Sequence, residues 1–568
     1  MKRHAFDLNI TVFAPFLFPG VAAGRYGLDR VALRKKGGDL VLPMDQVRGI
    51  LLHGVRALAK VTHDPAATTS NIRALFGAES GDATDDTAAS LDPLRGSLFL
   101  TDLTAPVPAS NLKTNTYPRV RIDEDSGAAA EGQLLFVEQL VAPGKDVDFT
   151  GELAFYCTDA EAEQRLQLLS AALRITLSVG SYKSIGFGLI KQETSGIVRR
   201  TVPAAPVASL PPESRIAWSF TLDRPYLVDA TRIANNAYLG SAAIPGGTLK
   251  GCLARNLQLL GVDIQTPEMQ QGLAALHVSH ARPTGSGDRT IPISIVQDSR
   301  TQTFHDLLAP HNTEPEFSPS FALDWKSDTE RLARGLLGQT EQIDTFEERV
   351  HSAINADTGA VVDEKLFSTI SVVPDKKGFQ SVLDFGGVAA DAKKTIADAL
   401  MRGLEGLGRT GARLGSNVLT PAQDQFSTVS AGEVCLILLS PGLCAQYDDG
   451  ADAPSAYAVF WQRIFPNSEL LDFYAAQSLV GGYQGRRFGL DDGQYRPWLL
   501  TNPGSVFKFA LDASDVPTAN AILARGLART EIAGTRLTWE NCPFVRENGY
   551  GEVSVYHPNK NLSEPRAN

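Results

Sequence analysis

Residues 42–58 read LPMDQVRGILLHGVRAL, and residues 244–260 read IPGGTLKGCLARNLQLL. In each stretch an apolar residue and a proline end a predicted strand, and a predicted helix follows. Both helices carry a basic residue directly before a glycine, Arg48 in the first and Lys250 in the second. The shared pattern predicts that one strand–helix unit occurs twice, about two hundred residues apart.

Two further blocks repeat downstream in the same order. Residues 121–136 (RIDEDSGAAAEGQLLF) match residues 352–367 (SAINADTGAVVDEKLF), and each block is followed by a polar turn and a predicted strand. The glycine-rich stretches 180–190 (GSYKSIGFGLI) and 408–418 (GRTGARLGSNV) each follow a helical pattern. Three matching blocks in one order predict two copies of one domain.

The copies are predicted at residues 1–200 and 213–425, joined by a linker rich in Pro and Ala. Within each, the predicted element order is βαββαβ, the ferredoxin-like (RRM-like) pattern, interrupted by insertions at residues 60–118 and 262–350. Residues 430–568 predict a third, degenerate copy with an altered element order. The predicted fold class is therefore α+β, with tandem ferredoxin-like domains.

Composition limits the class of protein. The chain has 568 residues, a net charge of −11 and five scattered cysteines. This length favours about three domains, and the cysteine spacing favours a reducing cytoplasm over a disulfide framework or a zinc site. The apolar run Val434–Leu439 is too short to span a membrane, so we expect a cytoplasmic protein without a membrane partner. The acidic charge means that nucleic acid would have to bind through local basic patches.

The first sixty residues reverse the sign of the charge, with ten Lys/Arg against four Asp/Glu. Five cations cluster in one predicted loop, which we call the basic loop (residues 25–36): Arg25, Arg30, Arg34, Lys35 and Lys36. A solvated loop is the simplest interpretation, but the local reversal favours an anionic partner. Asp29 lies inside this loop. It is either a salt-bridge partner of Arg25 or Arg34, or a group that deprotonates a hydroxyl or holds a metal.

The glycine-rich stretches pose a second choice. Gly406–Gly411 satisfies GxGxxG literally, but a helix is predicted before it and a strand after it, the reverse of a dinucleotide site. Such a loop is either a tight turn or a backbone nest suited to phosphate. Basic residues recur in these loops, including the tail stretch GGYQGRRFG (481–489), which favours phosphodiester contacts. The cations concerned are Lys183, Arg409, Arg413, Arg486 and Arg487.

The histidines show no close set of metal ligands. His277 and His280 are three residues apart, but no third ligand is evident, so a core or surface role is expected. His53 lies in an amphipathic helix, where a packed or capping role is the default.

In this order, the blocks resemble the RAMP superfamily of CRISPR effector subunits. Residues 27–58, together with GSYKSIGFG, resemble the backbone subunit of type III complexes. The remainder, 213–568, is similar to the larger RAMP subunit of type III-D systems, through AIPGGTLKGCLA (243–254), the second Leu-Phe block and GLGRTGARLG (406–415). The individual motifs are loose, and their order is the specific part.

The resemblance implies ferredoxin-like folds that bind a CRISPR guide RNA, insertions that act as thumbs between bases, and assembly with other effector subunits. In the backbone family an Asp before the first helix cuts target RNA, and Asp29 falls at that position. A divalent metal, magnesium by expectation, would accompany the cleavage. The second copy has no secure equivalent of Asp29 in its shorter loop, 229–240.

The leading hypothesis is a CRISPR type III effector subunit that binds guide RNA and positions and cleaves complementary target RNA. One alternative is a non-catalytic guide-RNA-binding subunit, and another is a guide-RNA-processing endoribonuclease that uses His53 or another histidine. The predicted catalytic residue is Asp29. The predicted RNA contacts are Arg25, Arg30, Arg34, Lys35, Arg48, Lys183, Lys250, Arg409, Arg413, Arg486 and Arg487.

Overall fold

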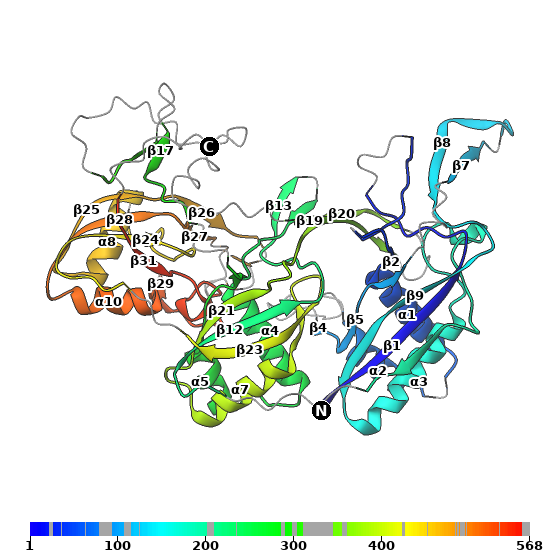
Figure 1. The fold of residues 1–568 in the computed structure, drawn as a ribbon, viewed down its shortest axis with the longest axis horizontal. Coiled ribbons are helices and arrows are strands. Elements are labelled where there is room, and N and C mark those ends of the chain that lie inside the picture. Colours follow the sequence, from blue (N-terminus) through cyan, green and yellow to red (C-terminus); the bar gives the residue numbers. More distant parts are fainter. Residues whose placement is uncertain are drawn as a thin grey trace.

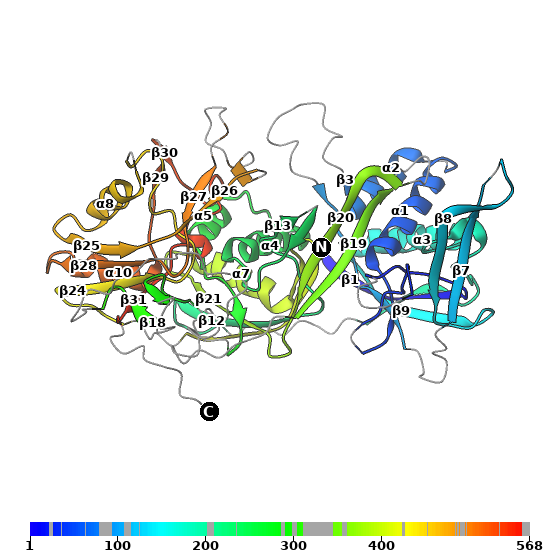
Figure 2. The same cartoon turned by 90° about the horizontal axis from the view of Figure 1, so that it is seen from above.

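The computed structural model describes the chain except for these residues: 22–26, 36, 63, 79–93, 107–114, 124, 202–209, 235, 286–289, 298–303, 310–344, 355–360, 423–426, 451, 483, 486–487, 489–494, 496, 533 and 559–568. Three large sheets follow one another in chain order along the longest axis of the molecule (Figures 1 and 2).

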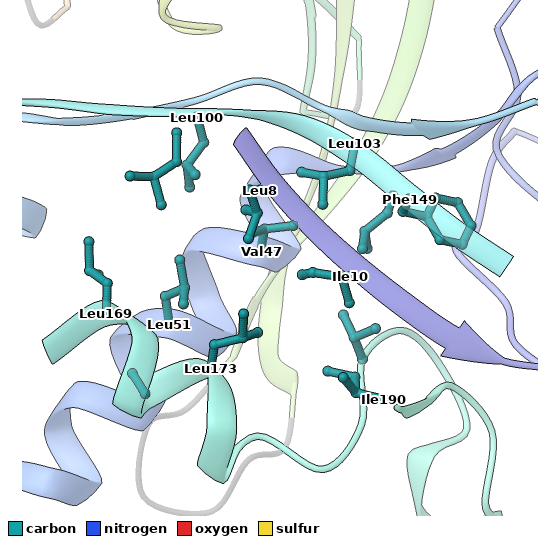
Figure 3. Packing of buried hydrophobic residues seen from close by; sticks show 14 of the residues in the cluster. Leu8, Ile10, Val47, Leu51, Leu100, Leu103, Phe149, Leu169, Leu173 and Ile190 are labelled. Atoms are coloured by element: carbon teal, nitrogen blue, oxygen red, sulfur yellow. The ribbon is translucent and has the colours of Figure 1, made fainter. Parts of the chain in front are cut away.

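The first sheet is built on β1 (Lys2–Phe13). The predicted alternation of apolar residues is confirmed, because Phe6, Leu8, Ile10 and Val12 are all buried. Their side chains pack against helices α1 (Met44–Ala59) and α3 (Asp159–Ile175), as Figure 3 shows for Val47, Leu51, Leu169 and Leu173. The other elements of this part are β2 (Leu40–Leu42), α2 (Pro65–Phe76), β3 (Gly77–Ala78), β4 (Leu94–Arg95), β5 (Leu98–Leu100), β6 (Leu103–Ala105), β9 (Asp146–Cys157), β10 (Leu189–Ile190) and β11 (Gly196–Arg199).

The strand order of this sheet is ferredoxin-like. The sheet runs β10–β1–β9–β6–β2, with β11 also beside β1 and β5 also beside β9, and its pairs are antiparallel. Counted as the four strands of a βαββαβ unit, this is the order 4-1-3-2.

The second sheet repeats this order. It runs β15–β21–β12–β23–β22, with β16 also beside β21, so the first strand β12 again lies between the fourth and the third. The elements are β12 (Arg215–Leu222), α4 (Gly246–Leu259), α5 (Pro267–Ala275), β15 (His277–Val278), β16 (Arg282–Pro283), β17 (Ile295–Gln297), β18 (Phe304–Asp306), β21 (Phe379–Asp384), α7 (Ala390–Arg402), β22 (Leu404–Leu407) and β23 (Ala412–Pro421). Arg48 and Lys250 are each the fifth residue of the first helix of their unit, as the matching sequence blocks require.

The third sheet has the same order, β25–β28–β24–β31, rather than the altered order that we expected. The sequence between β25 and β28 carries an extra strand pair, which obscures the unit when the sequence is read alone. The elements are β24 (Gly432–Leu438), α8 (Ala453–Ile464), β25 (Glu469–Tyr474), β26 (Gln477–Val480), β27 (Trp498–Thr501), β28 (Val506–Leu511), α10 (Val516–Arg525), β29 (Glu531–Ile532), β30 (Thr535–Arg536) and β31 (Val553–Tyr556).

Two long hairpins stand apart from the three sheets. One pairs β7 (Asn115–Ile122) with β8 (Ala129–Gln139), and the other pairs β19 (Thr345–Ile354) with β20 (Val361–Val373). The matching blocks at 121–136 and 352–367 therefore lie in hairpins and not in the main sheets. The second strand of each βαββαβ unit lies instead inside the predicted insertions, as β5–β6 and β15–β16. These pieces are two or three residues long, too short to show a strand period.

The GxGxxG stretch also differs from its predicted context. Gly406 belongs to β22, and residues 408–411 form the turn that joins β22 to β23. The stretch is thus a hairpin turn and not a helix-to-strand turn. Gly408 has a φ of +62°, and an added Cβ would lie 2.4 Å from the Leu227 carbonyl oxygen, so this turn needs glycine.

Candidate RNA-binding site

The basic loop is held against the base of hairpin β7–β8 by backbone hydrogen bonds. The amide of Asp29 donates to the Phe136 carbonyl (2.9 Å), and the amide of Glu138 donates to the Arg30 carbonyl (2.8 Å). The Asp29 carboxylate accepts the Phe136 amide at 2.7 Å, and Arg30 pairs in parallel with Val137. Asp29 is therefore an exposed carboxylate fixed at the foot of a projecting hairpin.

A buried acid anchors the same loop from below. Glu138 is 2% exposed, and its carboxylate accepts the Ala32 amide (3.0 Å) and pairs with Arg34. Arg34 is thus committed to holding the loop in shape, and its side chain is mostly covered. We predicted Arg34 as an RNA contact, but its guanidinium serves this internal ion pair.

The glycine-rich stretch of the first domain joins this surface. The Ser181 amide donates to the Leu17 carbonyl (2.9 Å), and the Leu33 amide donates to the Phe18 carbonyl (2.7 Å). Residues 15–18 therefore connect the stretch 180–188 with the basic loop. We call the joined surface, formed by residues 27–35, the base of hairpin β7–β8 and residues 180–188, the hairpin-base surface.

Aromatic rings and cations meet on the hairpin-base surface. The Arg119 guanidinium lies 4.1 Å from the ring centroid of Tyr182, and the rings of Tyr117 and Phe187 are 5.7 Å apart. Tyr182 adopts a φ of +61° and begins the short helix Lys183–Ile185, whose Lys183 is exposed. Single-stranded nucleic acid is bound by such combinations, because cations take the phosphates and rings take the bases.

Three cations are exposed on this surface: Arg30, Lys35 and Lys183. Arg30 and Lys35 come from the basic loop and Lys183 comes from the stretch 180–188, and the fold brings these two stretches together through the contacts described above. Phosphate is the anion that such a dispersed row of cations suits, because each cation can meet a different phosphate along a strand.

The second domain forms a similar junction. Strand β14 (Ala237–Leu239), paired with β13 (Thr231–Ala234), runs parallel to β20 at the base of its hairpin, as Arg30 does beside Val137. From the turn between β22 and β23, Arg409 lies 4.4 Å above the ring of Phe367. The ring of Phe367 stacks on His351, with 5.0 Å between centroids. Burial lowers the pKa of His351, although the carboxylate of Asp45 opposes this effect.

Three predicted RNA contacts have other roles. Lys250 is 1% exposed and donates to the Leu276 carbonyl at 2.9 Å, because residues of the third domain, including Trp539, cover helix α4. Arg48 is half-buried, donates to the Phe76 carbonyl and packs over that ring, and burial lowers its pKa. Arg413 lies 3.2 Å from the buried Glu405 carboxylate. We therefore leave these residues out of the candidate site.

Four cations of the sequence analysis lie outside the described residues: Arg25, Lys36, Arg486 and Arg487. Conversely, the structure brings in residues that sequence reasoning missed, namely Arg119, Tyr117, Tyr182, Phe367 and His351. A signal for one of them was present, since Tyr182 directly precedes Lys183 in SYKSIGF. The sequence near the hairpin residues gave no such signal, because the cations and rings that they contact are distant in sequence.

In the described part of the chain, no three His, Cys, Asp or Glu side chains gather as ligands for a metal ion. None of the helices there has the length and apolar character needed to cross a lipid bilayer. All five cysteines are buried free thiols.

The fold and this junction define a ferredoxin-like domain with a projecting hairpin and a basic, aromatic-lined base. Residues 9–191, about a third of the chain, match the family model of the RAMP superfamily. No curated protein matches the sequence.

Two solved structures share partial likeness with the chain. One is described as the Type III-B Cmr-beta bound to cognate target RNA, at 15% identity and a TM-score of 0.26, covering 35% of this chain and 61% of that one. The other is described as the same assembly bound to cognate target RNA and AMPPnP, at 14% identity and a TM-score of 0.28, covering 52% and 86%. The chain thus spans about three fifths of the first of these two.

Proposed function

We propose that the chain is a cytoplasmic RNA-binding subunit of a type III CRISPR effector complex, which binds guide RNA and presents complementary target RNA to Asp29. One observation carries the proposal. Within residues 9–191, which match the RAMP superfamily, an exposed carboxylate stands at the foot of a projecting hairpin, among exposed cations from two separate segments, the basic loop and the stretch 180–188. Guide RNA, target RNA and other effector subunits are the partners that follow.

Guide binding would use the phosphate backbone. Arg30, Lys35 and Lys183 are exposed on one surface, where they can neutralise successive phosphates without reading the bases. Sequence would be read by pairing between guide and target, as in other RNA-guided effectors. This division explains how a chain of net charge −11 can bind RNA through a limited surface.

Cleavage would occur by in-line attack of a ribose 2′-OH on the adjacent phosphorus. The 2′-oxygen forms a bond to phosphorus while the bond to the 5′-oxygen breaks, and the 5′-oxygen takes a proton from water, which leaves a 2′,3′-cyclic phosphate and a 5′-OH. Asp29 would accept the proton of the 2′-OH, and Arg30 would offset the charge that develops on the phosphoryl oxygens.

The residues at this place suit a divalent metal held mainly by RNA. Magnesium commonly binds one or two carboxylates together with substrate phosphates, and Asp29 offers one exposed carboxylate. A bound magnesium ion would supply positive charge close to the scissile phosphate.

The alternative of guide-RNA processing has less support. The rings of His280 and Tyr550 do meet between the second and third domains, with 4.7 Å between their centroids, and Lys250 is buried at the same boundary. Burial lowers the pKa of His280 to about 3 and that of Lys250 to about 7. Lys250 and Tyr550 are buried by protein, so RNA cannot reach two of these three groups. The other alternative, a binding subunit without chemistry, differs from our proposal only at Asp29.

RNA binding is tested with a triple variant, Arg30→Ala, Lys35→Ala and Lys183→Ala. Affinity for single-stranded RNA should fall for every sequence. Each phosphate contact contributes ~0.7 to the slope of log affinity against log salt, so the loss of three contacts should make this slope shallower by about two. Lys394→Ala is the matched control, because this exposed lysine lies on helix α7, at the lower edge of Figure 1, whereas the hairpins stand at the upper edge. An unchanged affinity and slope in the triple variant would reject the proposed surface.

A further inference from the structure

Hairpin β19–β20 belongs to the second domain but is bound to the first. The Arg349 guanidinium donates to both oxygens of Asp102, at 3.1 Å and 2.5 Å. Two residues further along the same strand, His351 Nδ1 lies 3.5 Å from the Asp45 carboxylate. Figure 2 shows this hairpin lying between the bodies of the two domains, beside α1 and α2. Hairpin β19–β20 is therefore attached to the first domain at these two points, beside other contacts between the copies such as that of Arg3 with Glu405.

Asp102 is itself fixed within the first domain. It lies between β5 and β6, and its carboxylate accepts the amide of Met44, the first residue of α1, at 2.9 Å. Burial alone would raise its pKa, but the hydrogen bonds and charge of Arg349 outweigh that effect and hold the pKa below its ordinary value. On the other side, Glu347 orients Arg349 through a 2.6 Å hydrogen bond to Nε. A bidentate Arg–carboxylate pair with both partners oriented fixes direction as well as distance.

Both hairpins are attached to one segment of the first domain. Its beginning, Asp29–Arg30, is bonded to the base of hairpin β7–β8. At its end, the Met44 amide donates to Asp102, which pairs with Arg349 of hairpin β19–β20, and Asp45 lies beside His351 of the same hairpin. Between these points, Leu40–Leu42 is paired with β6, which directly follows Asp102. The distance from one hairpin to the other is thus fixed through residues 29–45.

We propose that Asp102 and Arg349 are a positioning pair that sets the spacing between the two hairpins and so selects which nucleotides of the bound RNA lie over Asp29. The inference rests on the proposed function, because it assigns the pair a role on RNA. Without the pair, hairpin β19–β20 keeps its own strand pairing but loses its bidentate anchor. The hairpin should then sample several positions relative to Asp29.

The position of hairpin β19–β20 relative to helix α1 of the first domain is measured first, without RNA. Cysteines introduced at the exposed residues Ser352, in β19, and Lys60, after α1, carry spin labels, which is feasible because the five native cysteines are buried. Asp102→Asn keeps an oxygen for the Met44 amide and removes the charge, and Arg349→Gln breaks the pair from the hairpin side. Glu347→Gln is the matched control, since it removes one negative charge beside Arg349 but keeps an oxygen that can accept from Nε, and it does not touch the contact between copies. Both pair variants should broaden the distance distribution, and the control should leave it narrow.

The position of the RNA is measured next. The nucleotides protected in a bound RNA, and the 5′ ends of any cleavage products, are mapped at single-nucleotide resolution. In Asp102→Asn and Arg349→Gln the sharp pattern of the wild type should spread over neighbouring nucleotides, whereas Glu347→Gln should keep it. A change in stability alone lowers the amount of complex but does not move the pattern.

The outcomes separate the two levels of inference. A narrow distance distribution in both pair variants overturns the positioning role, and so does a broadened distribution with an unmoved RNA pattern. A wild-type chain that protects no RNA overturns the proposed function, and the role on RNA falls with it.

Discussion

At the scale of single residues, Asp29 combines two properties. One carboxylate oxygen accepts the Phe136 amide, which fastens the basic loop to the hairpin, and the side chain is nevertheless exposed. A structural carboxylate and a reactive one can therefore be the same group. The two roles call for different substitutions, because the clamp needs an acceptor oxygen, whereas proton transfer needs a carboxylate.

Asp29→Asn should keep the clamp and abolish proton acceptance, and Asp29→Ala should remove both. In an assembled complex with guide, target and magnesium, we expect both variants to bind RNA and to lose cleavage by about 10²–10⁴-fold. Only Asp29→Ala should also increase hydrogen exchange at the Phe136 amide. Cleavage that persists in both variants would make Asp29 a loop residue and the chain a binding module.

Lys250 is the residue for which the sequence misled us most. It occupies the same helical position as Arg48, so a shared RNA role was a natural inference. The third domain covers α4, and Lys250 lies under it, with its ammonium bonded to the Leu276 carbonyl. Sequence reasoning could not find this, because no local pattern reports which surface a later domain will cover.

The burial of Lys250 predicts a pH dependence. Burial lowers its pKa to about 7, against an opposing effect of Glu547, whereas a lysine in an unfolded chain has a pKa of about 10.4. Between about pH 7 and pH 10 the unfolded chain binds the extra proton, so stability should rise with pH across that window. Lys250→Met should remove this rise and increase the melting temperature at pH 7. The melting temperatures of the wild type and Lys250→Met are measured between pH 7 and pH 10, with the exposed Lys394→Met as control. The same dependence on pH in the wild type and Lys250→Met would contradict this account.

At the scale of elements, the strands and helices that could be predicted from the sequence are those long enough to show a full period of apolar residues. Strand β1 and helix α1 could be predicted, because each shows a full apolar period of its own. Strands β5, β6, β15 and β16 could not, since each has only two or three residues and is held by its neighbours in the sheet. The hairpin blocks were recognised as a repeat but interpreted as sheet strands, because strand pairing outside a sheet has the same local pattern as pairing within one.

Helix α1 carries two glycines that should respond in opposite ways to alanine. A Cβ at Gly54 would lie 2.7 Å from the Ala172 carbonyl oxygen in α3, so Gly54→Ala should destabilise the first domain by about 1–3 kcal/mol. Gly49 is exposed, with nothing within 4 Å of such a Cβ, so Gly49→Ala should stabilise by about 0.5–1 kcal/mol. Thermal melting of the two variants checks both signs. Equal shifts would mean that α1 and α3 do not pack this closely.

At the scale of the whole molecule, the three domains share one strand order but differ in what they expose. The first presents its hairpin-base surface. The second is attached to the first through Arg349 and, on its other side, to the third through Arg215 and Arg282, which donate to the carbonyls of Ala524 and Leu439. In the third, Tyr556 of the sheet bonds to Asp306, which ends β18 of the second domain. Repetition of a fold therefore does not imply repetition of a site, and the chemistry is expected in one copy.

A comparison of the first and second domains predicts how many times each chain cuts a bound target RNA. In the first domain, Asp29 is the carboxylate beside the strand that pairs with the hairpin base. In the second, that place is taken by β13 and β14, whose residues 231–240 contain no Asp or Glu. Asp229 precedes these strands, and burial raises its pKa. We therefore expect each chain to cut a bound target RNA once, at a site lost in Asp29→Asn. Mapping product ends by sequencing gives the count, and a second cut that survives Asp29→Asn would place catalytic groups outside the first domain.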